Sequence, residues 1–354
     1  MTFARSADTI APVQSNQHQR RGVLLVNLGS PSEPSTKAVR RYLNEFLMDP
    51  QVIDLPWPLR RLIVSCFILP TRPKASAAAY ASIWRANPPA SPLLHYSRLL
   101  TDQLAEQIDE TLVLAMRYGE PSIAQGMAAL ADCEQIFLIT AYPHHADSTR
   151  TTTIDAVQAL LGENQTLSVM PPFFEQPDYI EVLANNIGAN LPAEYDHLLF
   201  SYHGLPERHL TKADPTSSHC LQNPDCCQVA STAHATCYRH QVFATTNAVC
   251  AKLEIDAERH SVSFQSRLGR TPWLTPFTDQ RLAELAGQGV KRLAVVCPAF
   301  IADNLETLEE MGIQGREIFM DAGGEAFHLL PCLNDDPAWV ALLANWCQAP
   351  QKHA

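Results

Sequence analysis

The chain has 354 residues, of which 46% are hydrophobic and 18% are charged; these proportions are typical of a globular protein and exclude disorder throughout. The formal net charge of −11 would repel the phosphates of a nucleic acid, and no stripe of Lys and Arg interrupts it, so we expect no nucleic-acid partner. The length is sufficient for two domains, each with a core of its own.

Residues 1–20 are rich in Ser, Gln and Ala and show no apolar periodicity, which predicts a disordered tail. The tail lacks the apolar core of a signal peptide, and no later stretch has an uninterrupted apolar run long enough to span a bilayer. We therefore expect a cytoplasmic protein whose ten cysteines do not form disulfides.

Residues 22–31, GVLLVNLGSP, form a continuous aliphatic run that ends in Gly-Ser-Pro, as expected of a strand buried on both faces of a parallel sheet. Residues 35–47 follow with helical spacing behind a Ser N-cap. Similar aliphatic runs, each followed by a loop and a helical segment, occur at 112–119, 134–143, 197–204, 260–266 and 292–300. This alternation predicts an α/β protein with doubly wound, Rossmann-like parallel sheets that bind ligands at the carboxyl ends of their strands.

The domain boundary is expected near residues 172–185. We assign an N-terminal α/β domain to 21–178 and a C-terminal α/β domain to 179–335, the latter with a cysteine-rich insertion near 216–237. The last segment, 336–354, contains a helix that we expect to pack back on the first domain.

Residues 55–73 are apolar but are interrupted by Pro56, Pro58, Arg60 and Arg61, so they cannot span a bilayer. One interpretation is a core helix entered through a proline-rich loop. The other is an apolar lip that accepts a flat apolar ligand or rests on a membrane surface.

His203 follows directly after the predicted strand at 197–204, where Gly204 and Pro206 indicate a sharp turn at the edge of the sheet. A single histidine in such a position is more often a hydrogen-bonded loop residue than a ligand. Its function therefore depends on what lies opposite it.

Glu306 lies at the start of an acidic helical segment that follows the predicted strand at 292–300. It has a structural explanation, because Asp303 as N-cap and Glu306 three residues later complete a capping box. The functional explanation is that Glu306 and Glu310 share a helix face, where like charges cost stability unless they hold a cation. A neutral imidazole opposite such carboxylates can ligate a divalent cation and accept protons.

Several motifs resemble the signature stretches of ferrochelatases, the enzymes that complete haem synthesis, and they occur in the family's order over nearly the whole chain. They are VNLGSP with YLNEFLMDPQVIDLP, AMRYGEPS, SYHGLP, SFQSRLGRTPWLTPFTD and NLETLEEMG. The resemblance implies two chelatase-type domains that clamp a porphyrin, and insertion of ferrous iron into protoporphyrin IX to form protohaem.

The same resemblance assigns site residues. It implies that His203 and Glu306 are catalytic and bind iron. Because Glu310 shares a helix face with Glu306, we expect these two carboxylates together to deliver or hold the metal. Arg117 and Tyr118 are expected to contact the porphyrin, Arg117 through a propionate, although ordinary core packing would also explain Tyr118. Trp273 is expected to support the wall of the cleft.

Other functions remain open on the sequence alone. Coproporphyrin III could be the porphyrin, a cobalt chelatase of corrinoid synthesis would share the fold, and a non-catalytic tetrapyrrole or iron carrier would use the same pocket. A nucleotide-binding protein is disfavoured because no GxGxxG or P-loop motif follows a strand. The sequence does not define the oligomeric state.

The stretch ITAYPHHADS departs from the family pattern, because His144 and His145 stand where other residues are usual. A metal site is conceivable there, but we expect exposed loop histidines. Tyr142 and Pro143 match the family.

Cys220, Cys226, Cys227 and Cys237 lie in a stretch that typical ferrochelatases lack. Four cysteines so close together in a cytoplasmic protein indicate metal ligation, and adjacent Cys226 and Cys227 suit a [2Fe-2S] cluster better than one tetrahedral zinc. Some ferrochelatases carry such a cluster. The structural alternative is a loop of unligated thiols in which Cys237 is an ordinary helix residue.

Overall fold

The computed structural model describes residues 20–267, 269 and 271–349. The predicted tail, apart from Arg20, lies outside the described residues. The strands are β1 (Arg21–Ser30), β2 (Arg85–Ala86), β3 (Pro89–Ala90), β4 (Thr111–Gly119), β5 (Gln135–Thr140), β6 (Thr166–Val169), β7 (His197–His203), β8 (His260–Gln265), β9 (Arg292–Val296) and β10 (Ala326–Leu329).

The helices include three π-helices, η1, η2 and η5, and two short 3-10 helices, η3 and η4, within the described ranges. In chain order they are α1 (Thr36–Leu47), α2 (Trp57–Ile63), η1 (Val64–Ile68), α3 (Arg72–Ile83), α4 (Pro92–Ala105), α5 (Ile123–Ala129), η2 (Asp147–Thr151), α6 (Thr152–Gln158), α7 (Pro177–Asn190), α8 (Glu207–Ala213), η3 (Thr232–Ala235), α9 (Tyr238–Lys252), η4 (Ala257–Arg259), α10 (Thr278–Gly287), η5 (Glu306–Gly315), α11 (Arg316–Asp321) and α12 (Pro337–Gln348).

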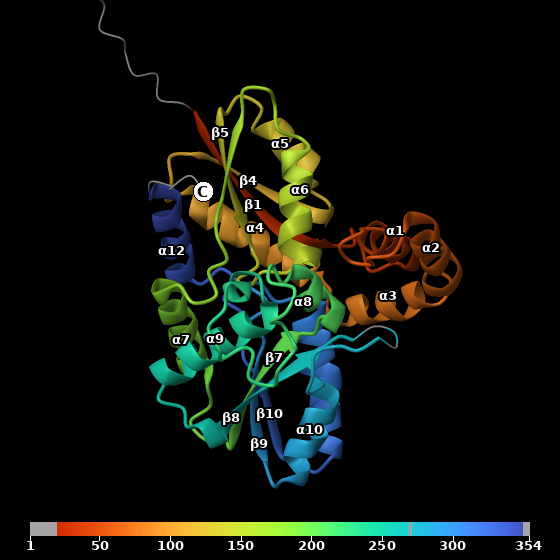
Figure 1. Cartoon of the computed structure of the whole chain (residues 1–354), viewed down its shortest axis with the longest axis vertical. Coiled ribbons are helices and arrows are strands. Elements are labelled where there is room, and N and C mark those ends of the chain that lie inside the picture. Colours follow the sequence, from red (N-terminus) through yellow and green to blue (C-terminus); the bar gives the residue numbers. More distant parts are fainter. Residues whose placement is uncertain (1–19, 268, 270, 350–354) are drawn as a thin grey trace, which may run out of the picture.

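Two four-stranded parallel sheets form the centres of two lobes. The first has the strand order β4-β1-β5-β6 and the second has the order β10-β9-β7-β8. Figure 1 shows the two sheets at opposite ends of the long axis, with α1, α2 and α3 projecting to one side. The predicted fold class, an α/β protein with two parallel sheets, is confirmed.

Both faces of each sheet are covered, which explains the continuous aliphatic runs. In β1, Val23 and Leu25 pack on the side of α4, whereas Leu24 and Val26 pack on the side of α5 and α6. In the second sheet, Leu199 packs towards α10 and its neighbours on the strand pack towards α7 and α9. Buried strands of this kind need apolar residues on both faces.

The C-terminal helix returns to the first lobe. Helix α12 contacts α4 and α7, and the Nε2 of Gln348 donates a hydrogen bond to the carbonyl oxygen of Gln107 at 3.2 Å. At the other end of the helix, Gln103 donates to Asp335. These contacts join the last helix to the first sheet's layer, as Figure 1 also shows.

Segment 55–73 forms α2, η1 and the start of α3 rather than a buried core helix. Trp57 is 62% exposed and Phe67 is 68% exposed, and Leu59 and Leu62 are also exposed. The core-helix interpretation is therefore wrong. The buried residue of α2 is Arg60, whose Nη1 donates to the carbonyl oxygens of Ile53 and Leu55, and it is η1 and α3 that pack on α1. Within the described residues, no helix combines the length and apolar character needed to cross a membrane.

Candidate functional site

His203 is the last residue of β7, and its imidazole is half-buried at the carboxyl edge of the second sheet. Its Nδ1 lies 2.6 Å from the carbonyl oxygen of Gly204. Because a carbonyl can only accept, Nδ1 donates, and in the neutral imidazole the lone pair therefore lies on Nε2. The imidazole is thus held in the tautomer that can ligate a cation or accept a proton through Nε2.

Gly204 is required by the close approach of two chain segments. A Cβ at this position would lie 2.8 Å from the carbonyl oxygen of Gln265 and 3.4 Å from Cε3 of Trp273. The amide of Gly204 donates to that same Gln265 oxygen at 2.7 Å. The turn after His203 is therefore tied to the neighbouring strand and lies close to the ring of Trp273, whose role in supporting the cleft wall stays a prediction.

Glu306 begins the π-helix η5, and its capping explanation is wrong. The helix start is capped by Asn304 and Thr307: the Oδ1 of Asn304 accepts from the amide of Thr307, and the amide of Asn304 donates to the Oγ1 of Thr307, both at 3.0 Å. Asp303 forms no capping box with Glu306, since its Oδ2 accepts from Nδ2 of Asn334 at 2.7 Å and its Oδ1 accepts from the hydroxyl of Thr307 at 3.0 Å. The side chain of Glu306 is left free of capping.

Burial raises the pKa of the Glu306 carboxyl, a positive charge on His203 opposes this, and the negative charge of Glu310 adds to it. These interactions show that the three predicted iron-site residues lie near one another. A carboxyl that resists ionisation in the empty site is stabilised as a carboxylate when a divalent cation arrives.

Glu310 is held more firmly than Glu306. Its Oε1 accepts from the amide of Ser266 at 2.9 Å, and its Oε2 accepts from the Ser266 hydroxyl. Ser266 has a φ of +66°, a conformation that non-glycine residues adopt only when the surrounding structure enforces it. The end of β8 and the π-helix are therefore fixed to each other beside the site.

A cavity of about 20 Å³ lies behind Glu306, where the carboxyl end of β1 meets the start of η5. Its polar lining includes Ser30, Ser91, Tyr42 and Tyr80. Burial raises the pKa of both phenols, so they stay protonated. The volume suits one water molecule, and Glu306 therefore shares this cavity with polar groups of the first lobe.

Arg117 and Tyr118 both contact Asp49. The Nη2 of Arg117 pairs with Oδ2 of Asp49, and its Nε donates to the hydroxyl of Thr152 at 2.9 Å. The hydroxyl of Tyr118 donates to the same Asp49 oxygen at 2.9 Å, and the ring is 1% exposed beside Phe46. The core-packing alternative accounts for Tyr118, while the Nη1 of Arg117 makes no hydrogen bond to a described residue.

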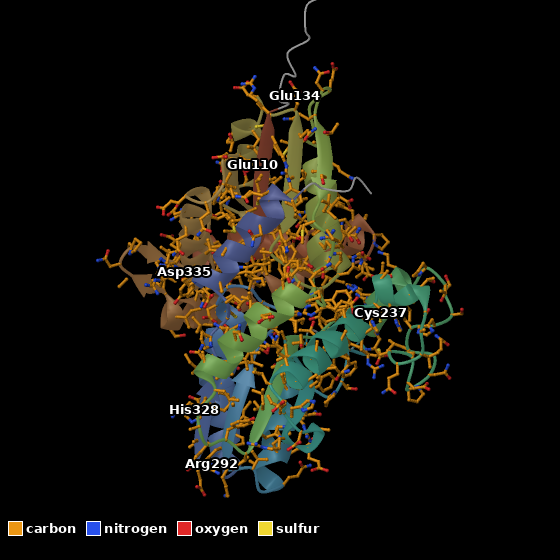
Figure 2. All side chains as sticks on the ribbon, turned by 90° about the vertical axis from the view of Figure 1, so that its left-hand side faces the viewer. Glu110, Glu134, Cys237, Arg292, His328 and Asp335 are labelled. Atoms are coloured by element: carbon orange, nitrogen blue, oxygen red, sulfur yellow. The ribbon has the colours of Figure 1, made fainter. Side chains whose placement is uncertain are left out.

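The four cysteines of the insertion lie close together. The thiol of Cys237 interacts with those of Cys220 and Cys227, and Cys226 interacts electrostatically with Cys220 and Cys227. Cys220, Cys226 and Cys237 are buried. The Nη1 of Arg239 lies 3.7 Å from Sγ of Cys226 and 3.6 Å from Sγ of Cys227. Figure 2 shows Cys237 beside the projecting loops of this segment.

Three histidines hold the backbone of the adjacent cysteines. The Nε2 atoms of His219 and His234 lie 2.7 and 3.0 Å from the carbonyl oxygen of Cys226, and Nδ1 of His240 lies 2.8 Å from that of Cys227. In all three contacts the ring nitrogen donates, because the partner is a carbonyl. These three bonds hold the backbone of the loop at Cys226 and Cys227.

His144 is buried, so the expectation of an exposed loop histidine is wrong. Its Nε2 contacts the hydroxyl of Thr245 at 3.0 Å, and its ring packs against Phe174, Tyr202 and Tyr238. Burial lowers its pKa to about 3. His145 is partly exposed and pairs with Asp147 at 3.6 Å.

In the part of the chain that the structure describes, no group of three or more His, Cys, Asp or Glu side chains is placed so that it could hold a metal ion.

Two residues near the site were not predicted. Asn304 has a readable signal, because Asn is a favoured N-cap and lies three residues before Thr307. Tyr238, whose hydroxyl donates to the backbone oxygen of His203 at 2.9 Å, has none beyond its position next to Cys237, since the contact joins residues far apart in the chain.

Comparisons with known proteins identify the family of this chain. A sequence model of the ferrochelatase family matches residues 20–350. The ferrochelatase of Pseudomonas fluorescens (strain Pf0-1) is 53% identical over 92% of this chain and 97% of its own length, and that of Ectopseudomonas mendocina is 52% identical over 93% and 98%. The structure titled SirB from Bacillus subtilis with Fe3+ is 11% identical, covers 92% of this chain and 93% of its own, and has a TM-score of 0.51, which concerns the fold alone. The chain belongs to the ferrochelatase family.

Proposed function

We propose that the chain inserts ferrous iron into protoporphyrin IX to form protohaem. The observation that carries this proposal is the tautomer of His203, whose Nε2 lone pair is free, together with Glu306, which is charge-coupled to it and released from capping. Family membership supports the same reaction.

The reaction exchanges two pyrrole N–H protons for one Fe2+, so two protons must leave the porphyrin. Nε2 of His203 accepts one proton, and the carboxylate of Glu306, which with Glu310 receives the ferrous ion, accepts the other as it gives that ion up to the porphyrin. Binding contacts distant from the metal, including one between Nη1 of Arg117 and a propionate, offset the strain of bending the macrocycle.

The test is anaerobic incubation of the purified chain with ferrous iron and protoporphyrin IX, followed by the absorbance of haem. Haem in large excess over protein supports the enzyme, whereas a plateau at one haem per chain supports a tetrapyrrole carrier. Parallel reactions with coproporphyrin III, and with Co2+ and a corrinoid precursor, compare the alternative substrates. A faster reaction with either would replace protoporphyrin IX in the proposal.

We also propose that Cys220, Cys226, Cys227 and Cys237 hold a [2Fe-2S] cluster. Four clustered thiols are the donor set of such a group, and Arg239 provides a positive charge next to two of them. When bound, the cluster would supply a one-electron redox centre and a cross-link across the insertion. Anaerobically prepared protein should contain two irons and two sulfides per chain; one tightly held zinc, or four free reactive thiols, would contradict this.

Finally, we propose that the exposed face of α2 and η1 contacts a membrane peripherally. Trp57, Leu62 and Phe67 project from this face, and residues 55–101 contain Arg and Lys but neither Asp nor Glu, although the whole chain is acidic. Such a surface suits an anionic bilayer. Sedimentation with vesicles containing phosphatidylglycerol should recover the wild-type chain and not the W57S/F67S variant; equal recovery of both would contradict the proposal.

A further inference from the structure

Tyr238 connects the cysteine-rich segment to the iron site. It is the first residue of α9 and directly follows Cys237. Its hydroxyl donates a hydrogen bond to the backbone oxygen of His203 at 2.9 Å, and its ring is buried. One side chain thus joins the last cysteine of the insertion to the residue that presents Nε2 to iron.

The peptide group between His203 and Gly204 sets the orientation of the His203 imidazole. The peptide between His203 and Gly204 is held on one side by Tyr238 and on the other by Gln265, whose carbonyl oxygen accepts from the amide of Gly204. The next carbonyl, that of Gly204, fixes Nδ1 of His203. Rotation of this peptide would therefore move the atom that sets the orientation of the ring.

The position of Tyr238 depends in turn on the cysteine segment. Cys237 directly precedes Tyr238 in the chain, and its thiol interacts with those of Cys220 and Cys227. Thr236 donates to the carbonyl oxygen of Ala213 at 2.7 Å, which closes the base of the segment. A change in what the cysteines bind would shift the start of α9 and, with it, the phenol of Tyr238.

We propose that Tyr238 is a positioning residue for His203. Through Tyr238, the orientation of the His203 imidazole at the iron site depends on what the thiol of Cys237 binds. This inference deepens the proposed ferrochelatase function and rests on it. Displacing a reacting group by about 1 Å costs roughly 100-fold in rate, so loss of one hydrogen bond at this peptide is expected to reduce kcat without preventing porphyrin binding.

The test compares Y238F with Y202F in the full chain. Tyr202 is the matched control: it is buried one residue before His203, and its hydroxyl bonds the hydroxyl of Thr246 at 2.9 Å, so Y202F loses a similar bond without releasing the His203 peptide. Rates are divided by the amount of porphyrin bound, so that misfolded protein does not lower the apparent kcat. Y238F should lose about tenfold or more in kcat with KM for porphyrin within about twofold, and Y202F should lose little. Wild-type kcat in Y238F, or equal losses in both variants, would overturn the proposal.

Two further measurements complete the test. The C237A substitution should lower kcat in the chain that keeps Tyr238 and change kcat little when it is combined with Y238F. Additive losses of kcat in the double variant would overturn the dependence on Cys237. Calorimetric titration with Co2+ measures metal binding at His203 without turnover. The relevant signal is the Co2+ binding that the wild-type chain shows and H203A lacks. Y238F should weaken that part and Y202F should not. If the wild-type chain makes no haem, the proposed function fails, whereas the Co2+ titration still decides the role of Tyr238.

Discussion

Asn304 and Thr307 bond each other reciprocally at the start of η5, through the side chain of one and the backbone amide of the other. This pair performs the capping that the sequence assigns to Asp303 and Glu306. The two roles are therefore divided between nearby positions: Asn304 stabilises the helix start, and the carboxyl of Glu306 is available for metal binding and catalysis.

Replacing Glu306 with Gln tests that division. E306Q keeps the size of the side chain and removes its charge, so we expect turnover to fall by about 100-fold or more, with the free energy of unfolding in urea nearly unchanged. The matched control is N304A, which should lose about 1 kcal/mol of stability. A destabilised E306Q that retains turnover would return Glu306 to a structural role.

Replacing His203 with Ala removes the proton acceptor at the end of β7. We expect almost no haem formation, while quenching of porphyrin fluorescence shows that the substrate still binds, because the imidazole is half-buried and only locally bonded. H197A serves as a control for loss of a histidine on the same strand, since His197 contacts Ser261 at the opposite end. Wild-type turnover in H203A would refute the mechanism.

The fold could be predicted because its signal is local. Each strand buried on both faces has a continuous aliphatic run, and β1, β4, β5, β7, β8 and β9 were all predicted, whereas the short edge strands β6 and β10 were missed because four residues carry too little pattern. The site was predicted less completely. The burial of His144 depends on α9, which is about 100 residues away in the chain, and the sequence does not contain that contact in readable form.

Burial of His144 should make stability depend on pH. Its pKa is about 3 in the folded chain and about 6.5 when unfolded, so between these values the unfolded state binds more protons and stability falls as the pH falls. The slope from this group approaches 1.4 kcal/mol per pH unit. In the H144Q variant, which can still donate to Thr245, the free energy of unfolding should fall less steeply between pH 6 and pH 4, with a slope smaller by about 1.4 kcal/mol per pH unit. Parallel curves would mean that His144 is protonated in the folded chain.

Asp214 organises the loop that presents Cys220. Its Oδ2 accepts from the amides of His219 and Cys220 at 2.8 and 2.9 Å, and its Oδ1 accepts from the amide and hydroxyl of Thr216 at 2.8 and 2.7 Å. Although burial works in the other direction, these donors hold the pKa of Asp214 well below its usual range. The carboxylate is therefore the acceptor around which the loop folds.

Replacing Asp214 with Asn leaves one acceptor oxygen and turns an amide NH2 group towards backbone donors, which should loosen the loop around Cys220. In protein stripped of metal, Cys220 should then react with a thiol reagent about tenfold faster or more. D225N is the control, because Asp225 is exposed in the same loop and should leave the rate unchanged. Mass spectrometry of the modified peptide measures the rate. Unchanged reactivity of Cys220 in D214N would mean that the histidines and Arg239 suffice to hold the segment, and that the four thiols are gathered before any metal binds.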